Sequence, residues 1–338
     1  MSPEKIPDRM NVVVLDAYTG AETLHVEQRP VPKPGPGQAL VKVAASSINP
    51  SDLAFLRGSY GVRKPLPVVP GFEGSGTVVA VGRGLMGRYL LGKRVACVSS
   101  DAGEGAWAEY MLTTFGLALP LAASVSLEQG AMSVVNPLTA MAFLTIIQDG
   151  NHNTIIQTAA ASALGQMVDR LCQREGVRVI NIVRRPEQVA VLHKQGAIMV
   201  LNSSDPGFDQ ALRQACQLYP PRLAFDAVSG ALTMQVLDAM PPHSKVTVYG
   251  GLSGEAAQAN PGNLIFAGKS IDGFWLTSWL GKKGFLGQLM LWRRAQKLIG
   301  TDLKTEIRKQ YPLREAQQAV RVYQAQMTGG KVLIVPGR

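Results

Sequence analysis

One stretch of the chain, residues 153–185, constrains the fold more than any other. It reads NTIIQTAAASALGQMVDRLCQREGVRVINIVRR. A short apolar run at 154–157 meets a cluster of small residues at 158–165, after which apolar residues recur at helical spacing. A second apolar run covers 177–183. This order predicts a strand, a tight turn, a helix and a second, parallel strand.

The predicted turn has the composition of a site for a dinucleotide diphosphate. Small side chains let backbone N–H groups approach phosphate, and the N-terminus of the following helix carries partial positive charge. Such turns usually have glycine at three points, but here only Gly165 follows the pattern, while Ser162 and Ala163 stand where glycine is usual and Ala161 precedes them. A pattern this degenerate also fits an ordinary strand–helix turn packed with small residues.

Two arginines extend the argument to the identity of the cofactor. Arg184 and Arg185 end the second predicted strand, about 20 residues beyond the turn. An acidic residue at that place would hold the ribose 2′-hydroxyl of NAD, whereas guanidinium groups match the oxygens of a 2′-phosphate. We therefore predict that the stretch binds NADPH.

Length and charge place the chain in a broad class. Its 338 residues are enough for two domains, and 34 basic against 24 acidic residues give a net charge of +10. That charge favours anionic partners, but the basic residues are scattered, so we expect no specific nucleic-acid binding. Three unclustered cysteines suit reduced packing residues, and no apolar run reaches the length of a membrane span. We expect a soluble, cytoplasmic protein.

The pattern of predicted secondary structure changes near residue 122. Before it, short runs of alternating apolar residues at 41–44, 76–81, 94–98 and 106–112 predict a β-rich, barrel-like unit without a long helix. Beyond it, strands and helices alternate, which predicts an α/β fold with a doubly wound parallel sheet. We predict a barrel domain from residues 1–122 and 301–338 and a nucleotide-binding Rossmann domain from residues 123–300.

The later elements of this pattern can be placed in the sequence. Asn136 and Pro137 predict the capped start of a helix over 138–148. The remaining predicted strands lie at 198–202, 223–228, 246–250, 270–276 and 331–335, and the predicted helices at 127–132, 187–195, 208–218, 232–239, 287–299 and 313–327.

Motifs spread over nearly the whole chain resemble the medium-chain dehydrogenase/reductase superfamily. Residues 47–52 and 69–76 are similar to its two catalytic-domain signatures, and the resemblance implies a GroES-like barrel beside the Rossmann domain. In the zinc alcohol dehydrogenases of that superfamily these signatures carry a cysteine and a histidine ligand, where this chain has Asn49 and Phe72. Catalytic zinc needs three ligands from Cys, His, Asp or Glu, so we expect no metal.

Within the superfamily the chain resembles the zinc-free branch of quinone oxidoreductases and mitochondrial-type 2-enoyl thioester reductases. The motifs at 136–140, 180–184, 249–251 and 273–279 are more similar to the enoyl thioester reductases, above all the two tryptophans of the last motif. Tyr60 is similar in placement to the tyrosine that these reductases use at the reacting centre.

Two residues are candidates for catalysis. A phenol such as Tyr60 can stabilise and protonate the enolate left by hydride addition, although a tyrosine in a Gly-flanked loop also suits a surface turn. The family implies that Asn49 contacts the nicotinamide, but asparagine before proline is also ordinary turn chemistry. Further candidate cofactor contacts, each with a plain structural alternative, are Thr139, Tyr249, Gly250, Gly251, Phe274, Trp275 and Lys331.

These observations predict a zinc-independent, NADPH-dependent reductase of α,β-unsaturated carbonyls, with 2-enoyl thioesters as the first choice of substrate. An NADPH:quinone oxidoreductase is the alternative, and a catalytically weak NADPH-binding, redox-sensing protein is an alternative of another class. The resemblance implies a homodimer, with edge pairing near residues 270–276. The basic residues would suit an acidic acyl carrier protein as partner.

Overall fold

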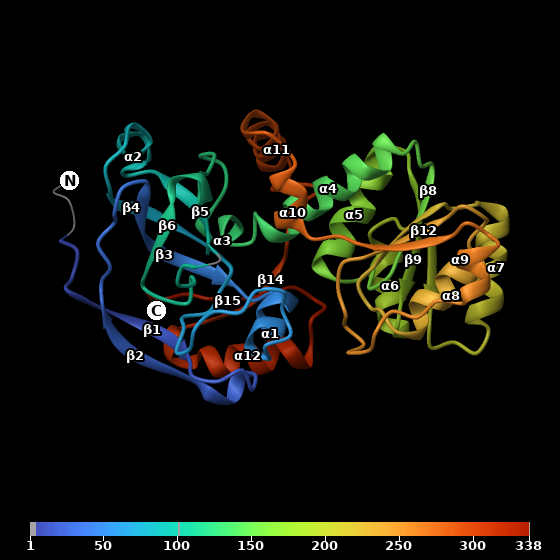
Figure 1. Ribbon diagram of the computed structural model, residues 1–338, viewed down its shortest axis with the longest axis horizontal. Coiled ribbons are helices and arrows are strands. Elements are labelled where there is room, and N and C mark those ends of the chain that lie inside the picture. The colour runs from blue at the N-terminus through green and yellow to red at the C-terminus, as the bar shows by residue number, and fades with distance from the viewer. Residues whose placement is uncertain (1–4, 101, 338) are drawn as a thin grey trace. The chain divides into compact units, whose positions relative to one another are not determined.

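The computed structural model describes residues 5–100 and 102–337, and these form two compact units (Figure 1). Unit 1 holds the residues up to Val135 together with 296–300 and those from Lys304 onward. Unit 2 holds 136–295 and 301–303. The predicted combination of a β-rich unit and a unit with a parallel sheet between helices is confirmed.

Unit 1 is built around β3, the longest of its strands. This strand pairs with β4, β6 and β15, all in antiparallel register. Six strands of its seven-stranded sheet follow the order β14-β15-β3-β4-β5-β7, and β6, the seventh, pairs with β3 off this path. A separate hairpin joins β1 to β2. The strands are β1 (Arg9–Leu15), β2 (Leu24–Pro30), β3 (Gln38–Ser47), β4 (Glu73–Val81), β5 (Arg94–Val98), β6 (Tyr110–Thr114), β7 (Ala118–Pro120), β14 (Ile307–Tyr311) and β15 (Lys331–Ile334).

The strand predicted at 106–112 lies instead at β6, a few residues later. Its first part does not continue the ladder with β3, because the carbonyl of Trp107 accepts from Val13 N at 2.9 Å and Ala108 bridges to Val12. Short helices that the pattern did not reveal also occur among the first 120 residues. The helices of unit 1 are η1 (Ala21–Thr23), α1 (Pro50–Leu56), α2 (Leu85–Leu90), η2 (Phe115–Leu117), α3 (Leu127–Gly130), η3 (Leu313–Glu315) and α12 (Ala316–Ala325).

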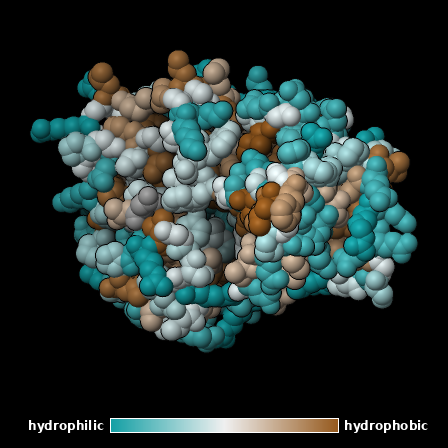
Figure 2. All heavy atoms as spheres, turned by 45° about the vertical axis from the view of Figure 1, so that its right-hand side comes forward, coloured by the Kyte–Doolittle hydropathy of each residue, from teal (hydrophilic) through white to brown (hydrophobic). Residues whose placement is uncertain are grey.

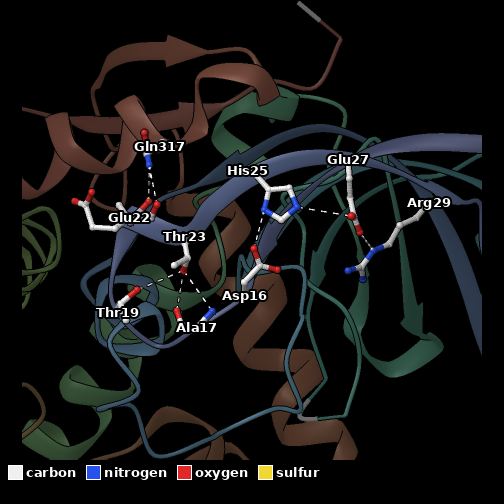
Figure 3. A network of polar contacts seen from close by, with 10 residues as sticks. Asp16, Ala17, Thr19, Glu22, Thr23, His25, Glu27, Arg29 and Gln317 are labelled. Atoms are coloured by element: carbon white, nitrogen blue, oxygen red, sulfur yellow. Dashed lines mark hydrogen bonds and ion pairs between the residues drawn. The ribbon is translucent and has the colours of Figure 1, made fainter.

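The end of the chain returns to its beginning. Helix α12 packs against β2 and η1, and Gln317 donates to the carbonyls of Ala21 at 3.0 Å and Glu22 at 3.3 Å (Figure 3). In the same place the Thr23 hydroxyl donates to the Ala17 carbonyl at 2.9 Å. The two bonds of Gln317 join residues nearly 300 positions apart, and pairing of β15 with β3 places Lys331 in the first unit as well.

Residues 123–135 correct the predicted domain boundary. We assigned them to the nucleotide-binding domain, but they belong to unit 1. The Ser75 hydroxyl donates to the Leu127 carbonyl at 2.5 Å, and the Glu73 carboxylate accepts from the amides of Val134 and Val135 at 3.1 and 2.9 Å. The same carboxylate explains why α4 (Val135–Asp149) begins before Asn136, since it occupies the capping place that we expected the asparagine to fill.

Unit 2 is a six-stranded parallel sheet of order β10-β9-β8-β11-β12-β13, with α5 and α7 on opposite sides of it (Figure 1). Its two central strands, β8 and β11, are buried along their whole length, as expected of strands covered on both faces. The strands are β8 (Thr154–Gln157), β9 (Arg178–Val183), β10 (Met199–Asn202), β11 (Leu223–Asp226), β12 (Lys245–Val248) and β13 (Ser270–Gly273). The helices are α4, α5 (Ala163–Arg174), α6 (Pro186–Lys194), α7 (Phe208–Leu218), α8 (Ala231–Ala239), α9 (Pro261–Ile265), α10 (Leu276–Gly281) and α11 (Phe285–Leu298).

Three further findings concern the helices, the surface and the cysteines. None of the described helices is long and apolar enough to cross a membrane. Apolar side chains form small groups on the face seen in Figure 2, separated by polar ones. Cys97, Cys172 and Cys216 are buried and free, as expected of packing residues.

Candidate cofactor and substrate site

The turn between β8 and α5 keeps two features that glycines give to dinucleotide-binding turns, close packing of helix on strand and a positive φ. Ser162 caps the helix, since its hydroxyl accepts from Gly165 N at 3.1 Å. A Cβ on Gly165 would lie 2.4 Å from the carbonyl oxygen of Ala160, so only glycine lets the helix approach the strand this closely. Ala159 takes the positive φ of 49° that glycine would favour. The predicted residues Ala161, Ser162, Ala163 and Gly165 all lie in this turn or in the first turn of α5.

The turn lies at the point where the strand order of the sheet reverses. β8 has β9 on one side and β11 on the other, and ligands of such sheets bind beyond the carboxyl ends of the strands at that point. A buried hydrogen bond fixes these two strand ends, since the Thr158 hydroxyl donates to Asp226 Oδ1 at 2.7 Å. The same hydroxyl accepts from Ala227 N at 2.8 Å, and Thr233 donates to the other carboxylate oxygen of Asp226 at 2.6 Å. Thr158 and Asp226 were not among the predicted site residues, although Thr158 directly follows β8 and Asp226 ends β11 beside the expected crevice.

Arg184 and Arg185 directly follow β9, at the same edge of the sheet. Their amides both donate to Gln188 Oε1 at 3.1 Å, which fixes the backbone at this strand end. The side chain of Arg184 is exposed, and the Nε atom of Arg185 lies 3.1 Å from a carboxylate oxygen of Glu187. The two arginines therefore differ: Arg184 presents its guanidinium to solvent, whereas Arg185 is already engaged by an acidic neighbour.

A pocket of about 550 Å³ opens at the carboxyl ends of β12 and β13. Four predicted residues line it, namely Tyr249, Gly250, Phe274 and Trp275. Its other lining residues are Val248, Gly273, Ser278, Trp279 and Lys282. Gly251, also predicted, follows them in the chain and is exposed. The aromatic motif at 273–279 thus contributes to one apolar pocket on the sheet edge that also carries the turn and the arginines.

The ring of Phe143 packs against two of the residues that line this pocket. Phe143 of α4 stacks on Phe225 of β11 with ring centroids 3.9 Å apart, and it meets the rings of Tyr249 at 5.0 Å and Phe274 at 4.9 Å edge-on. Such ring pairs favour fixed orientations. The predicted residue Thr139 lies one turn before Phe143 on α4 and is only 6% exposed.

In unit 1, Asn49 and Lys331 belong to a buried polar network. Lys331 donates to Asn49 Oδ1 and, at 3.0 Å, to the Ile48 carbonyl. The Asn49 amide group donates to Ser47 Oγ at 3.0 Å and to Glu73 Oε1 at 2.8 Å. Asn49 is 1% exposed and Lys331 2% exposed, so both ends of the Asn49 side chain are bonded inside the unit. A contact of either residue with a cofactor stays a prediction.

Asp52 completes the network and begins α1. Its carboxylate accepts from Asn49 N at 2.7 Å and from Phe72 N at 3.0 Å. Burial raises the pKa of Asp52 to about 7, against the opposing effect of these two hydrogen bonds. Burial also lowers the pKa of Lys331 to about 8, opposed by the negative charge of Glu73 and Asp52. The run Asn-Pro-Ser-Asp is a local helix-start signal that was not recognised in the sequence, with asparagine at the cap, proline at N1 and aspartate at N3.

Tyr60 lies in the loop after α1, where its ring packs on Phe72 with centroids 4.8 Å apart. Phe72 also meets Phe55 of α1 edge-on at 5.5 Å, and Tyr60 is partly exposed. The residue at the position of the family's histidine ligand therefore supports Tyr60 by ring packing. Within residues 5–100 and 102–337, no three or more His, Cys, Asp and Glu side chains cluster as metal ligands would.

Comparison with known proteins identifies the family. Residues 35–123 match the family model described as alcohol dehydrogenase GroES-like domain, and residues 163–289 match the one described as zinc-binding dehydrogenase. A mitochondrial enoyl-[acyl-carrier-protein] reductase of Caenorhabditis elegans is 31% identical over 255 residues, which cover 73% of this chain and 71% of the relative. The chain belongs to the medium-chain dehydrogenase/reductase superfamily.

Further relatives place it within that superfamily. The enzyme of the same name from Arabidopsis thaliana is 31% identical over 245 residues, covering 71% of this chain and 64% of the relative, slightly less than two thirds. A crystal structure from Mesorhizobium loti, described as a candidate NADPH:quinone reductase, is 36% identical with a TM-score of 0.91. That match covers 98% of this chain and all of the other.

Proposed function

We propose that this chain is a zinc-independent, NADPH-dependent reductase of activated double bonds, with 2-enoyl thioesters as substrates. One observation carries the proposal. At one edge of the unit 2 sheet, a turn of small residues, packed closely through Gly165, lies beside the exposed Arg184. The relatives named enoyl-[acyl-carrier-protein] reductase support the choice of substrate.

The residues of unit 2 fit the proposed cofactor. Backbone amides of the turn and the N-terminus of α5 would hold the diphosphate, and a Cβ on residue 165 would clash with the Ala160 carbonyl and push the helix away from the turn. The guanidinium of Arg184 would bind the 2′-phosphate, and the hydrogen bond from Thr158 to Asp226 keeps the two strand ends in place. When bound, NADPH supplies the hydride for the reduction.

Tyr60 is the proposed donor at the reacting centre. Hydride addition to the β-carbon of an enoyl thioester leaves an enolate, and its charge must be met by a fixed donor before the α-carbon takes a proton. The Phe72 ring holds the phenol, whose O–H would donate to the enolate oxygen. We further propose that Asn49 and Thr139 lie close to the nicotinamide. Asn49 would then act from within its network, because its amide is already bonded to Glu73 and Ser47.

The pocket beside Tyr249 gives a place for an apolar group. Trp275, Trp279 and Phe274 supply its apolar walls, and Lys282 supplies a positive charge. An acyl chain would be stabilised there by removal of apolar surface from water. A quinone ring would fit the same walls, and the Mesorhizobium loti structure favours this second candidate function.

The proposed partners follow from charge and from an open strand. β13 ends the unit 2 sheet with mostly exposed residues, so we propose that two copies pair along it as a homodimer. Lys282, Lys283, Arg293 and Arg294 lie on and beside α11, and an acidic acyl carrier protein would be attracted by them. We place the protein in the cytoplasm as part of the same proposal.

The test is a comparison of acceptors. Purified protein would be mixed with NADPH or NADH and then with crotonyl-CoA, longer 2-enoyl-CoA esters or 1,4-quinones, following the loss of reduced-nicotinamide absorbance. We expect turnover of enoyl-CoA with NADPH, reduced about 100-fold or more by Tyr60→Phe, since a positioned proton donor contributes on that order. Tyr89→Phe, which changes an exposed tyrosine of α2, is the matched control.

Other outcomes lead to other functions. Quinone turnover that Tyr60→Phe leaves unchanged would replace the enoyl reductase proposal with a quinone reductase. Tight NADPH binding without oxidation by any acceptor would leave only a cofactor-binding protein, an outcome motivated by alanine at the positive-φ position 159.

A further inference from the structure

The loop that carries Tyr60 connects α1 to β4 and contains no helix or strand of its own from residue 57 to 67. A loop of this length is ordinarily mobile, because few backbone hydrogen bonds hold it. A residue that donates a proton must instead be fixed to within a fraction of an ångström. The contacts of this loop therefore decide whether Tyr60 is held firmly enough to act as the proposed donor.

Lys64 anchors the far end of the loop. Its ammonium group donates to the hydroxyl of Ser99 at 2.8 Å, to the carbonyl of Ser100 at 2.9 Å and to the carbonyl of Gly103 at 2.5 Å. The residue is only 8% exposed. An ammonium has three protons to donate, and here all three have an oxygen acceptor, as a buried cation requires.

Tyr18 and Arg63 hold the rest of the loop. The Tyr18 hydroxyl accepts from Lys64 N at 2.8 Å and lies 2.8 Å from the Lys64 carbonyl, to which it donates. The guanidinium of Arg63 donates twice to the Gly58 carbonyl, at 3.0 and 2.8 Å, and so closes the loop across Tyr60. Arg63 also lies over the Tyr18 ring, 5.6 Å from its centroid.

The acceptors of Lys64 lie next to the residue that packs on Tyr60. Ser99 N donates to the Phe72 carbonyl at 2.9 Å, while the Phe72 ring contacts Tyr60. Two contacts of the same region therefore hold Tyr60. Phe72 packs on its ring, and the Lys64 ammonium, bonded to Ser99 beside Phe72, holds its loop.

We propose that Lys64 is a positioning residue for Tyr60, acting through the cage that its three acceptors, Ser99, Ser100 and Gly103, form around the ammonium group. The proposal rests on the proposed function, because it assigns Lys64 a part in the reaction only through the phenol. Without the ammonium the loop between residues 58 and 67 would move, and the phenol would lose its alignment with the substrate.

A double-mutant cycle tests it with enoyl-CoA reduction as the readout. Lys64→Met keeps the length of the stem and removes the three hydrogen bonds, and we expect it to lower kcat about 10- to 100-fold with little change in the KM for NADPH. In a Tyr60→Phe background the same change should cost less than about 3-fold, because the group that Lys64 positions is already missing. Equal losses in both backgrounds would overturn the proposal, since they would show general damage to the unit.

Two further measurements keep the test decisive if Lys64→Met folds poorly. Ser99→Ala removes one acceptor of the cage and should show the same non-additivity with a smaller loss. Hydrogen exchange of residues 58–67 should rise in Lys64→Met and stay at the wild-type level in Lys33→Met, which changes an exposed lysine. Unchanged exchange in Lys64→Met would also overturn the proposal.

Failure of the proposed function would look different. If Tyr60→Phe kept full turnover, the role of the phenol would be wrong whatever the exchange showed. If Tyr60→Phe lost turnover and Lys64→Met kept it, the function would stand and the positioning role of Lys64 would be wrong.

Discussion

The turn after β8 in unit 2 and the polar network around Asn49 in unit 1 are built in different ways. The turn uses backbone groups, a helix N-terminus and one glycine, and its side chains are small and uncharged. The network uses buried Glu73, Asp52 and Lys331, whose charges are far from solvent and must balance one another. A site of the first kind tolerates exchange among small residues, whereas a site of the second kind depends on each of its members.

The largest expected effect follows from removing the buried cation. Lys331→Met leaves the Glu73 and Asp52 carboxyl groups without their cationic neighbour and the Asn49 amide oxygen without its donor. Loss of one partner of a buried charged group costs about 3 to 5 kcal/mol of unfolding free energy. Urea denaturation measures the loss, and Lys309→Met on the neighbouring strand β14, an exposed lysine, should lose less than about 1 kcal/mol.

The stability lost on Lys331→Met should depend on pH, which further distinguishes the charged network of unit 1 from the uncharged turn of unit 2. Because burial lowers the pKa of Lys331 to about 8, the native lysine releases its proton at a lower pH than the lysine of the unfolded chain, whose pKa is about 10.4. Between these values the unfolded state binds more protons, so this group makes the protein more stable as pH rises. The difference in stability between wild type and Lys331→Met should therefore grow from about pH 8 to about pH 10. A constant difference would show that the lysine titrates normally.

Gly165→Ala should have the next largest effect and is confined to unit 2. The new Cβ would lie 2.4 Å from the Ala160 carbonyl oxygen, a backbone atom that cannot move alone. We expect a loss of about 1 to 3 kcal/mol, as for other overpacked sites, together with weaker NADPH binding. Thermal unfolding and a fluorescence titration with NADPH measure both. Gly207→Ala, where the added Cβ meets no atom within 4 Å, is the control.

These two regions also differ in how far the sequence predicts them. The turn, its helix and the arginines lie within one 33-residue stretch, 153–185, so spacing alone located them. The network joins Asn49, Glu73 and Lys331 from distant parts of the chain, and pairing of β15 with β3 brings them together. No periodicity shows that pairing, so the sequence offered Lys331 only as a candidate cofactor contact and gave no sign of its hydrogen bond to Asn49.

Short helices and helix starts were predicted poorly for a related reason. Helix α1 covers only seven residues and lies within a motif that the sequence analysis treated as a catalytic signature. The start of α4 was misplaced because its capping carboxylate, Glu73, comes from β4 about 60 residues earlier in the chain. The local sequence predicts a cap only when the capping side chain is a neighbour in the chain. A cap supplied by a distant side chain leaves no signal in the local sequence.

Arg184→Ala has a smaller effect than these and acts on specificity alone. The exposed guanidinium contributes little to folding, so thermal stability should stay within about 0.5 kcal/mol of wild type. Loss of a charge-assisted bond to the 2′-phosphate should reduce the preference for NADPH over NADH about 10-fold or more. Arg213→Ala, an exposed arginine of α7, should keep the preference. If Arg184→Ala kept it too, Arg185 would have to leave Glu187 and hold the phosphate instead.

The smallest expected effect tests whether the turn was optimised for stability. Ala159 has a φ of 49°, a region that costs a residue with Cβ roughly 1 kcal/mol or more and glycine nothing. Ala159→Gly removes this strain but gives the unfolded chain more freedom, so a net gain of about 0.5 kcal/mol is expected. Ala211→Gly in the middle of α7 should instead lose about 1 kcal/mol, because its backbone is helical and unstrained. If Ala159→Gly destabilised the protein as much as Ala211→Gly does, the methyl group of Ala159 would contribute packing that outweighs the strain. The turn would then depend on its side chains, as the network of unit 1 does.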